Sequence, residues 1–279
     1  MTEPAAPLVG VGRGATPPPR AARLLAVVRR HWVVYSSTFL ANALPAFFEP
    51  VLFLTAIGLG LGNYVEGGMA GLPMAAYMGP GALAMTAMFT AAFESTYGAY
   101  VRLVYQQTYA GMLATPLTPA DVFLGEVVWC GLKGVGFTAI VLSVYLAFAA
   151  VRGWTHLLAP TFLLAPLVGF LCGALFSGLA FHVTALTRNM NNFNFFISGA
   201  LTPMSLFSGM VFPVADLPAG LRELAYALPL FHVTELNRLL LFGPEHCVAW
   251  VAASPVYLVA VTAAVVASGV RLMCNRVVR

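Results

Sequence analysis

The sequence contains very little charge. Only 9% of its 279 residues are Asp, Glu, Lys or Arg and 60% are hydrophobic, whereas about a quarter of the residues in a soluble domain are charged. This composition excludes an ordinary soluble enzyme or binding module and indicates an integral membrane protein. The chain is therefore best divided into membrane spans, each of about 20 apolar residues.

Cysteine and lysine are also scarce, which excludes several kinds of site. The four cysteines, Cys130, Cys172, Cys247 and Cys274, form no CxxC pair and no metal-ligand spacing, so neither a disulfide framework nor a metal site is expected. The single lysine is Lys133, and the sequence contains no GxxxxGK[ST] phosphate-binding loop. No HExxH or GxSxG motif occurs either. We expect no catalytic residue and no cofactor on this chain.

Six apolar segments have the length needed to cross a bilayer. They are Thr38–Leu61, Met74–Phe93, Val127–Ala150, Leu163–Leu186, Phe193–Phe212 and Val248–Val270. We expect each to form a transmembrane helix, so the fold class is an all-α membrane protein. The triplet Ala41-Asn42-Ala43 resembles a signal-peptide cleavage site, but the apolar sequence continues to Leu61, which favours an uncleaved first span.

Basic residues are distributed unevenly between the two sides of this arrangement. With both termini in the cytoplasm, ten of the fourteen basic residues lie inside, three lie outside and Lys133 falls within a span. The inside group is Arg13, Arg20, Arg23, Arg29, Arg30, Arg102, Arg188, Arg271, Arg276 and Arg279, and the outside group is Arg152, Arg222 and Arg238. The positive-inside rule therefore predicts cytoplasmic termini. The net charge of +4 indicates membrane lipid headgroups, rather than nucleic acid, as the charged partner.

The N-terminal region divides into a tail and a helix. Residues 1–19 are rich in Pro, Gly and Ala and are expected to be a disordered tail. Residues 20–35 alternate basic and apolar residues in a helix-like way, which predicts a basic amphipathic helix along the cytoplasmic membrane face. The alternative for residues 20–35 is a positively charged segment that simply flanks the first span. Residues 36–279 are expected to form the six-span domain.

Two connecting segments differ from simple loops. Tyr105–Glu126 contains two prolines and several polar residues yet keeps apolar ones, and the charge rule places it in the cytoplasm. Asp216–Phe242 begins a helix at Asp216, is interrupted at Pro229 and is followed by Gly243. Its two pieces are too short to cross the membrane, so we expect a short re-entrant helical hairpin that dips into the outer leaflet.

Small residues recur within the spans. Gly169 and Gly173 form a GxxxG motif, and Gly131, Gly134 and Gly136 recur in the preceding span. Helices approach each other closely in lipid at small residues, so these positions indicate packing faces. The pattern leaves open whether they join spans of one chain or two chains.

Four stretches of the chain carry a family resemblance. They are FFEPVLFLTAIGLGLGNYV (Phe47–Val65), FESTYGAYVR (Phe93–Arg102), YAGMLATPLTPADVFLGEVVW (Tyr109–Trp129) and SGMVFPVADLPAGLRELAYALPLFHVTELNR (Ser208–Arg238). In this order within a six-span frame they resemble the permease subunits of type-2 ABC exporters, especially the NodJ-like branch associated with lipo-oligosaccharide export. The resemblance extends from about Arg23 onward.

The resemblance implies that the loop between spans two and three is a coupling helix, which inserts into a groove on a separate ATPase subunit. Its candidate residues are Tyr109, Met112, Leu113, Thr115, Pro116, Leu117, Pro119 and Asp121. Pro116 and Pro119 stiffen the turn, and a rigid element transmits a partner's movement better than a flexible one. The alternative is an interfacial helix that contacts only lipid. By the same resemblance, the amphipathic helix at residues 20–35 would be the interface helix that clasps the ATPase together with this loop, with Arg23, Arg29, Arg30 and Trp32 as its candidate residues. The outer hairpin would form the outward gate.

The resemblance further implies an exporter in the bacterial cytoplasmic membrane, built from two copies of this chain and two cytoplasmic ABC ATPase subunits that bind ATP and Mg²⁺. The expected substrate is an amphiphile such as a lipo-oligosaccharide or another glycolipid, although drug and antibiotic exporters of the family look alike at this level. A self-contained ion-coupled carrier is the alternative; Pro45 and Pro50 around Glu49 are a faint hint of it, but its internal repeat is missing. A membrane-embedded transferase lacks a convergent catalytic set.

Six charged residues are candidates for the transport path or for gating. They are Glu49, Glu94, Glu126, Lys133, Glu235 and Arg238. A carboxylate at the middle of a span costs roughly 2.5–3.5 kcal/mol on insertion scales, so Glu49 should face protein, water or a cation, or be protonated. Lys133 is expected to pair with Glu94 or snorkel inward, and Glu235 and Arg238 form either an i,i+3 pair or a solvated helix face. The alternative for the buried charges is a role in packing and folding.

Overall fold

The computed structural model describes residues 18–40, 44, 48, 51–52, 55–56, 60 and 68–278. Most of the first predicted span, Thr38–Leu61, lies outside these residues, and so do Glu49 and the predicted tail up to residue 17. The described residues form helices and no strand, which confirms the all-α class.

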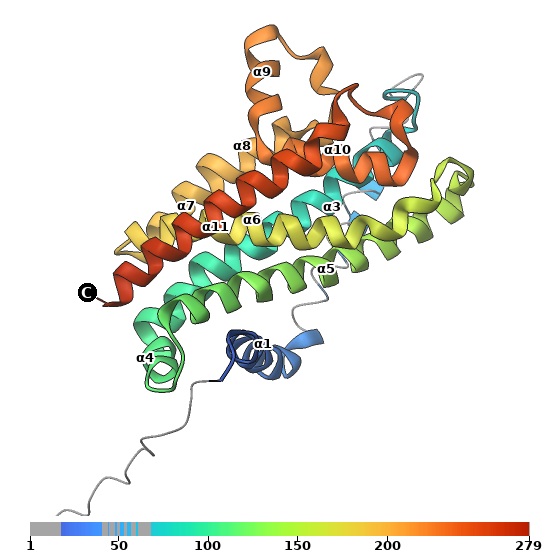
Figure 1. The fold of residues 1–279 in the computed structure, drawn as a ribbon. Helices are drawn as coiled ribbons and strands as arrows, with labels where there is room; N and C mark the ends of the chain where they lie inside the picture. Colours follow the sequence, from blue (N-terminus) through green and yellow to red (C-terminus); the bar gives the residue numbers. More distant parts are fainter. Residues whose placement is uncertain are drawn as a thin grey trace, which may run out of the picture.

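Within the described part of the chain, four long helices form the body of the molecule (Figure 1). They are α3 (Met74–Phe93), α5 (Pro119–Arg152), α6 (Ala165–Leu186) and α11 (Ser254–Val278). Among the described residues, three segments are long and apolar enough to cross a membrane: Pro119–Arg152, Pro160–Leu186 and Val251–Val277. They correspond to the third, fourth and sixth predicted spans, and α3 has the bounds predicted for the second.

The helix that begins as α3 continues beyond its predicted end at Phe93. Two π-helical turns follow, η3 (Glu94–Gly98) and η4 (Val101–Tyr105). The next long helix, α5, begins at Pro119 rather than at the predicted Val127, because Thr118 and Asp121 form a capping box. The Thr118 hydroxyl accepts the backbone N–H of Asp121 at 3.2 Å, while the Asp121 carboxylate accepts the Thr118 N–H at 3.0 Å.

The predicted fifth span, Phe193–Phe212, is not one regular α-helix. It divides into α7 (Phe193–Phe196), η8 (Ile197–Leu201), α8 (Thr202–Ser205) and η9 (Leu206–Met210), and the 3-10 turn η7 (Met190–Asn192) precedes it. Pro203 lacks the N–H that would continue the α-helical hydrogen-bond ladder. Gly209 has φ +76°, a left-handed conformation that ends the run.

The predicted outer hairpin consists of α9 (Ala219–Ala227) and α10 (Pro229–Phe242). Asp216 closes the 3-10 turn η10 (Val214–Asp216), so α9 begins three residues later than predicted. Pro229 starts α10, where its missing N–H costs nothing. The Leu230, Val233 and Leu241 side chains of α10 are fully buried in the protein core, so α10 packs against the long helices.

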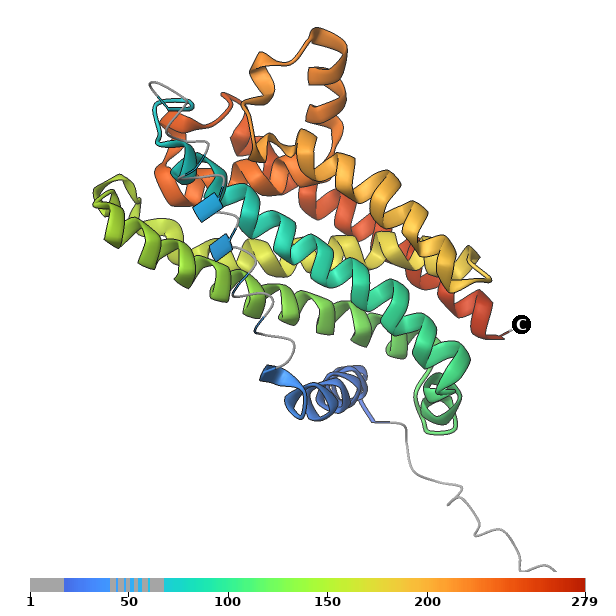
Figure 2. The same cartoon turned by 180° about the vertical axis from the view of Figure 1, so that it is seen from behind.

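The broken run from η7 to η9 lies alongside the long helices, and the other short elements gather at their two ends (Figures 1 and 2). α4 (Thr108–Leu113) lies at one end, where α11 also finishes, and α1 (Arg20–Ser36) runs beside the same part of α5. The opposite end carries α9 and α10 together with η5 (Thr155–Leu157), η6 (Pro160–Leu164), η11 (Pro244–His246) and η12 (Val251–Ala253). The two unusual connections therefore lie at opposite ends of the bundle.

Glycines bring α5 and α6 into backbone contact. A Cβ atom on Gly134 would lie 2.2 Å from the carbonyl oxygen of Gly169, and one on Gly173 would lie 2.5 Å from that of Cys130. Real Cβ atoms do not approach this closely, so a larger residue at either position would force the helices apart. These small residues therefore join two spans of the same chain.

Candidate functional site

The connection between α3 and α5 folds into a short, well-defined unit, here called the coupling loop (residues 106–121). Gln107 precedes α4 with φ +51° and turns the chain back. At the other end of α4, the Thr115 hydroxyl donates to the carbonyl of Met112 at 2.6 Å. The capping box at Thr118 then starts α5. The turn between α4 and α5 is thus fixed at both ends by local hydrogen bonds.

The coupling loop has an inner and an outer face. Tyr109 and Met112 are 1% and 8% exposed, and together with the partly buried Leu113 and Leu117 they pack into the apolar cluster around Phe123. The exposed residues of the tip are Ala110, Gly111, Ala114, Thr115 and Pro116. Among the predicted coupling residues, Tyr109 and Met112 therefore hold the loop to its own chain, whereas Thr115 and Pro116 face outward.

Arg102 is the centre of a largely buried charge network that packs against this loop. Its guanidinium donates to Glu94 Oε1 at 2.7 Å and to Glu126 Oε2 at 2.6 Å. The Tyr109 hydroxyl donates to Glu126 Oε1 at 2.8 Å, and Lys133 Nζ donates to Glu94 Oε2 at 2.8 Å. These bonds confirm the predicted pair of Lys133 with Glu94, and they connect the end of α3, the coupling loop and α5.

The ionisation of the network follows from its charge pairs. Burial raises the pKa of the Glu94 carboxyl, but the charges of Arg102 and Lys133 outweigh burial and hold that pKa at about 2. Burial and the nearby Glu126 raise the pKa of the Tyr109 phenol well above its usual value. At neutral pH, Glu94 is therefore an acceptor and Tyr109 keeps the proton that it donates.

Ion pairs attach α1 to the coupling loop and to α5. Arg23 Nη1 lies 3.0 Å from Asp121 Oδ2, and Arg20 Nε lies 3.7 Å from Asp121 Oδ1. His31 Nε2 lies 3.1 Å from Glu126 Oε1. Asp121 thus caps α5 and also forms ion pairs with α1. Glu126 contacts His31 of α1 and therefore connects α1 to the Arg102 network.

Aromatic contacts and close packing complete the attachment of α1. The His31 ring stacks on Trp129 with centroids 5.7 Å apart, and Tyr35 meets the same indole edge-on at 5.5 Å. A Cβ atom on Gly125 would lie 2.7 Å from Val27, so the absence of a side chain there lets α1 approach α5. The predicted amphipathic helix is therefore held against the protein along one face.

The four candidate residues of α1 occupy different positions. Arg23 is paired with Asp121, and Arg30 lines a groove of about 380 Å³ between α1 and the coupling loop. This groove is also lined by Ala26, Val27, Met112, Thr115, Pro116 and Leu117. Arg29 is exposed, and Trp32 is 57% exposed on the side of α1 that carries Leu25 and Val33. α1 thus presents a basic and apolar surface beside the exposed tip of the loop.

Glu235 and Arg238 form a second buried charge cluster at the opposite end. Arg238 donates to Glu235 and to the carbonyl of Gly209, the latter at 2.7 Å, while Glu235 Oε2 accepts the N–H of Val248 at 2.9 Å. The guanidinium also lies 4.3 Å from the ring centroid of Tyr77. The predicted i,i+3 pair is confirmed, and the solvated alternative is wrong because both side chains are buried.

Several residues of the Arg102 network and of its contacts with α1 were not singled out by the sequence as site residues. Arg102 entered the topology argument only as an inside charge, although it follows Glu94 by eight residues, just over two helical turns. This spacing places Arg102 near Glu94 only if the helix continues past Phe93, which it does. No local sequence pattern marks His31 or Trp129 as a site residue, because their contacts join segments about a hundred residues apart.

Comparison with known proteins supports the same family. The profile of the ABC-2 type transporter family matches residues 22–242. Nodulation protein J of Rhizobium leguminosarum bv. viciae is 36% identical over 233 residues, covering 82% of this chain and 86% of that protein. Nodulation protein J of Sinorhizobium fredii is 36% identical over 216 residues, 77% of this chain and 79% of the relative, and that of Bradyrhizobium diazoefficiens is 32% identical over 250 residues, 89% and 93%. The chain belongs to the ABC-2 type transporter family, as a membrane permease subunit.

Proposed function

We propose that this chain is the transmembrane subunit of an ATP-driven exporter whose separate ATPase docks on the coupling loop and on α1. The observation that carries the proposal is the exposed tip of the coupling loop, held by the Arg102 network. A force on the tip reaches α3 through Glu94 and α5 through Glu126, while α1 is attached through Asp121. A loop without such anchors would bend without moving the spans.

The proposed exporter contains two copies of this chain and two cytoplasmic ATPase subunits. ATP and Mg²⁺ would be bound by the ATPases. Each permease would cross a bacterial inner membrane six times, with both termini in the cytoplasm. Residues 20–35 would form the interface helix and residues 36–279 the six-span domain. The outer hairpin α9–α10 is the candidate outward gate, because the Glu235–Arg238 cluster connects it to η9 and to the residues after η11.

The proposed substrate is an amphiphile with a lipid tail and a polar head, such as a lipo-oligosaccharide or another glycolipid. Its support is the similarity to proteins named Nodulation protein J and the resemblance to the branch associated with lipo-oligosaccharide export. Export of a drug or antibiotic is the alternative within the family. An ion-coupled carrier is the alternative outside it.

A charge on the exposed tip is expected to uncouple the transporter. We predict that Ala114→Glu weakens ATPase association about tenfold or more, because an unpaired carboxylate would be buried in the docking groove. Ala114 is exposed, so the fold should tolerate the change, whereas a charge at the partly buried Leu113 or Leu117 would also disturb the core. Co-purification with the ATPase and ATP-dependent transport in proteoliposomes measure the effect.

The matched control is Leu221→Glu, which adds the same charge to an exposed position on α9 at the other end. It should leave ATPase association unchanged. Full association and transport by Ala114→Glu would contradict the docking surface. Transport by the chain alone, in liposomes that lack ATP and the ATPase, would decide for the ion-coupled carrier.

Surface labelling tests the orientation. In a variant without the native cysteines, we expect Gly220→Cys on α9 to react with a membrane-impermeant maleimide in intact cells, because it lies on the outer side. Arg188→Cys, which follows α6, should react only after the membrane is opened. Both native positions are exposed, so burial does not limit either reaction. The reverse labelling pattern would overturn the proposed topology and with it the docking site.

A further inference from the structure

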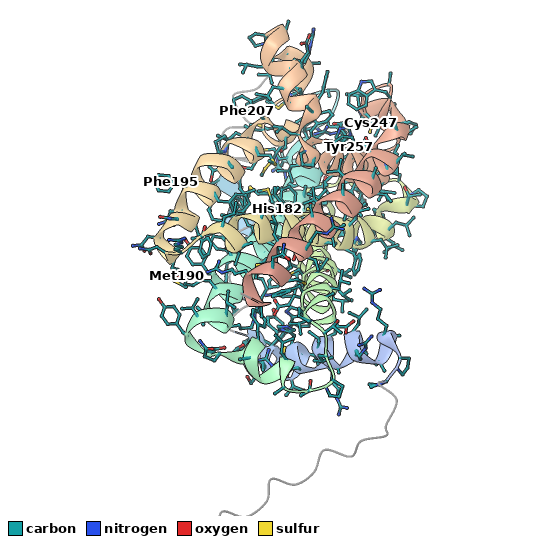
Figure 3. The ribbon with its side chains drawn as sticks, turned by 60° about the vertical axis from the view of Figure 1, so that its left-hand side comes forward. His182, Met190, Phe195, Phe207, Cys247 and Tyr257 are labelled. Atoms are coloured by element: carbon teal, nitrogen blue, oxygen red, sulfur yellow. The ribbon has the colours of Figure 1, made fainter. Side chains whose placement is uncertain are left out.

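A separate groove lies between the C-terminal ends of α6 and α11. Its volume is about 440 Å³, and its lining includes Leu186, Thr187, Arg188, Leu272, Asn275 and Arg276. His182, labelled in Figure 3, precedes Leu186 by four residues on α6, and its ring is 3.0 Å from the Ser268 hydroxyl of α11. This contact holds the helices together, so the groove is bordered by two fixed helix ends.

Arg276 is held in place at the groove. Its guanidinium donates to the carbonyl of Thr184 near the end of α6 and lies 5.6 Å from the ring centroid of Tyr100. The Tyr100 hydroxyl in turn donates to the carbonyl of Arg188 at 2.7 Å. A guanidinium has five N–H donors, and the described contacts of Arg276 use few of them. The remaining donors are available to an anion in the groove.

The positive charge of this groove has no acidic counterpart among the described residues. The acidic side chains at this end, Glu94, Asp121 and Glu126, are all engaged in the ion pairs around Arg102 and α1. Neither Arg188 nor Arg276 forms a salt bridge in the described part of the chain, and Arg188 is exposed. Two guanidinium groups at one groove favour a ligand with a phosphate, which accepts several hydrogen bonds at once.

Apolar side chains at the same groove narrow the class of ligand. Leu186 is 75% exposed at its edge, and Leu272 lines it from α11. A free phosphate or an acidic protein segment would leave these side chains in water. A lipid places its phosphate beside the arginines and its acyl chains beside the leucines.

We propose that the groove between the ends of α6 and α11 is a binding site for an anionic phospholipid. Arg188 and Arg276 would bind the phosphate, and Leu186 and Leu272 would contact the first part of the acyl chains. Basic pockets between spans on the cytoplasmic side are suited to such headgroups. Its place in the cytoplasmic leaflet rests on the proposed orientation, whereas the binding site itself requires no ATPase.

Native mass spectrometry of the full chain in detergent tests this site. Dioleoyl phosphatidylglycerol should be retained more strongly than dioleoyl phosphatidylcholine, and Arg188→Gln should reduce that retention about fivefold, the contribution of one basic residue near an anionic headgroup. Arg188 makes no described side-chain contact with the core, so this variant should fold normally. The control is Arg152→Gln, an exposed arginine at the opposite end of α5, which should leave retention unchanged.

Three results would overturn the proposal. The first is equal retention of the two lipids by the wild-type chain, and the second is an equal loss in Arg188→Gln and Arg152→Gln, which would show general attraction to positive charge. The third is displacement of the lipid by soluble glycerol phosphate at a similar concentration, which would show a simple anion site. Since the measurement omits the ATPase, failure of the coupling-loop variants would leave this result intact.

Discussion

Replacing Arg102 with leucine is expected to destabilise the chain by about 3–5 kcal/mol, the typical cost of removing one partner from a buried ion pair. Glu126 is fully buried and accepts from Arg102 at 2.6 Å, so the substitution leaves its charge with His31 and Tyr109 only. The thermal unfolding midpoint in detergent measures the loss. Arg29→Leu removes the same side chain from an exposed position on α1 and should change the midpoint little.

A second substitution separates the ion pair from the volume of the side chain. In Arg102→Leu combined with Glu126→Gln, the buried charge is gone, and most of the lost stability should return. The stability of Arg102→Lys should lie between those of Arg102→Leu and the wild type, because one ammonium replaces the guanidinium that bonds to two carboxylates. If Arg102→Leu unfolds at the wild-type temperature, or if the double variant is less stable than the single one, the network does not hold the coupling loop.

The elements that the sequence predicted well are those governed by local composition. Met74–Phe93 and the helix ending at Leu186 were placed correctly because uninterrupted apolar runs of this length have few alternatives to a helix. The helix at residues 20–35 was also placed within one residue at its end, since its alternation of basic and apolar side chains has a helical period. Proline and glycine correctly marked the division of the outer hairpin.

The errors arose where tertiary contacts compete with composition. The start of α5 at Pro119 depends on the capping box, which makes a polar segment continuous with an apolar one. α10 resembles a surface helix in sequence, but the Glu235–Arg238 pair satisfies its charges internally and allows burial. The partners of Arg102 are 8 and 24 residues away along the chain. A single sequence contains no signal for such pairs until the helix ends are known.

The sequence also left open whether the glycines of α5 and α6 pack spans of one chain or of two chains. We predict that Gly134→Ala lowers the free energy of unfolding by about 3 kcal/mol, at the upper end of the usual cost of overpacking. The new Cβ would lie 2.2 Å from the carbonyl oxygen of Gly169, and backbone atoms cannot rotate away as a side chain can. α5 and α6 must therefore separate along the contact that also includes Gly173.

Gly136→Ala is the matched control, because it makes the same change two residues later on α5 where no described atom lies within 4 Å of the new Cβ. Its unfolding midpoint should equal that of the wild type or rise slightly, since alanine favours a helix over glycine. Size-exclusion chromatography with light scattering distinguishes the two possible partners of the motif. If Gly134→Ala leaves the midpoint unchanged but converts a dimer to a monomer, the glycines join two chains; a lowered midpoint in the monomer itself shows that they join α5 to α6.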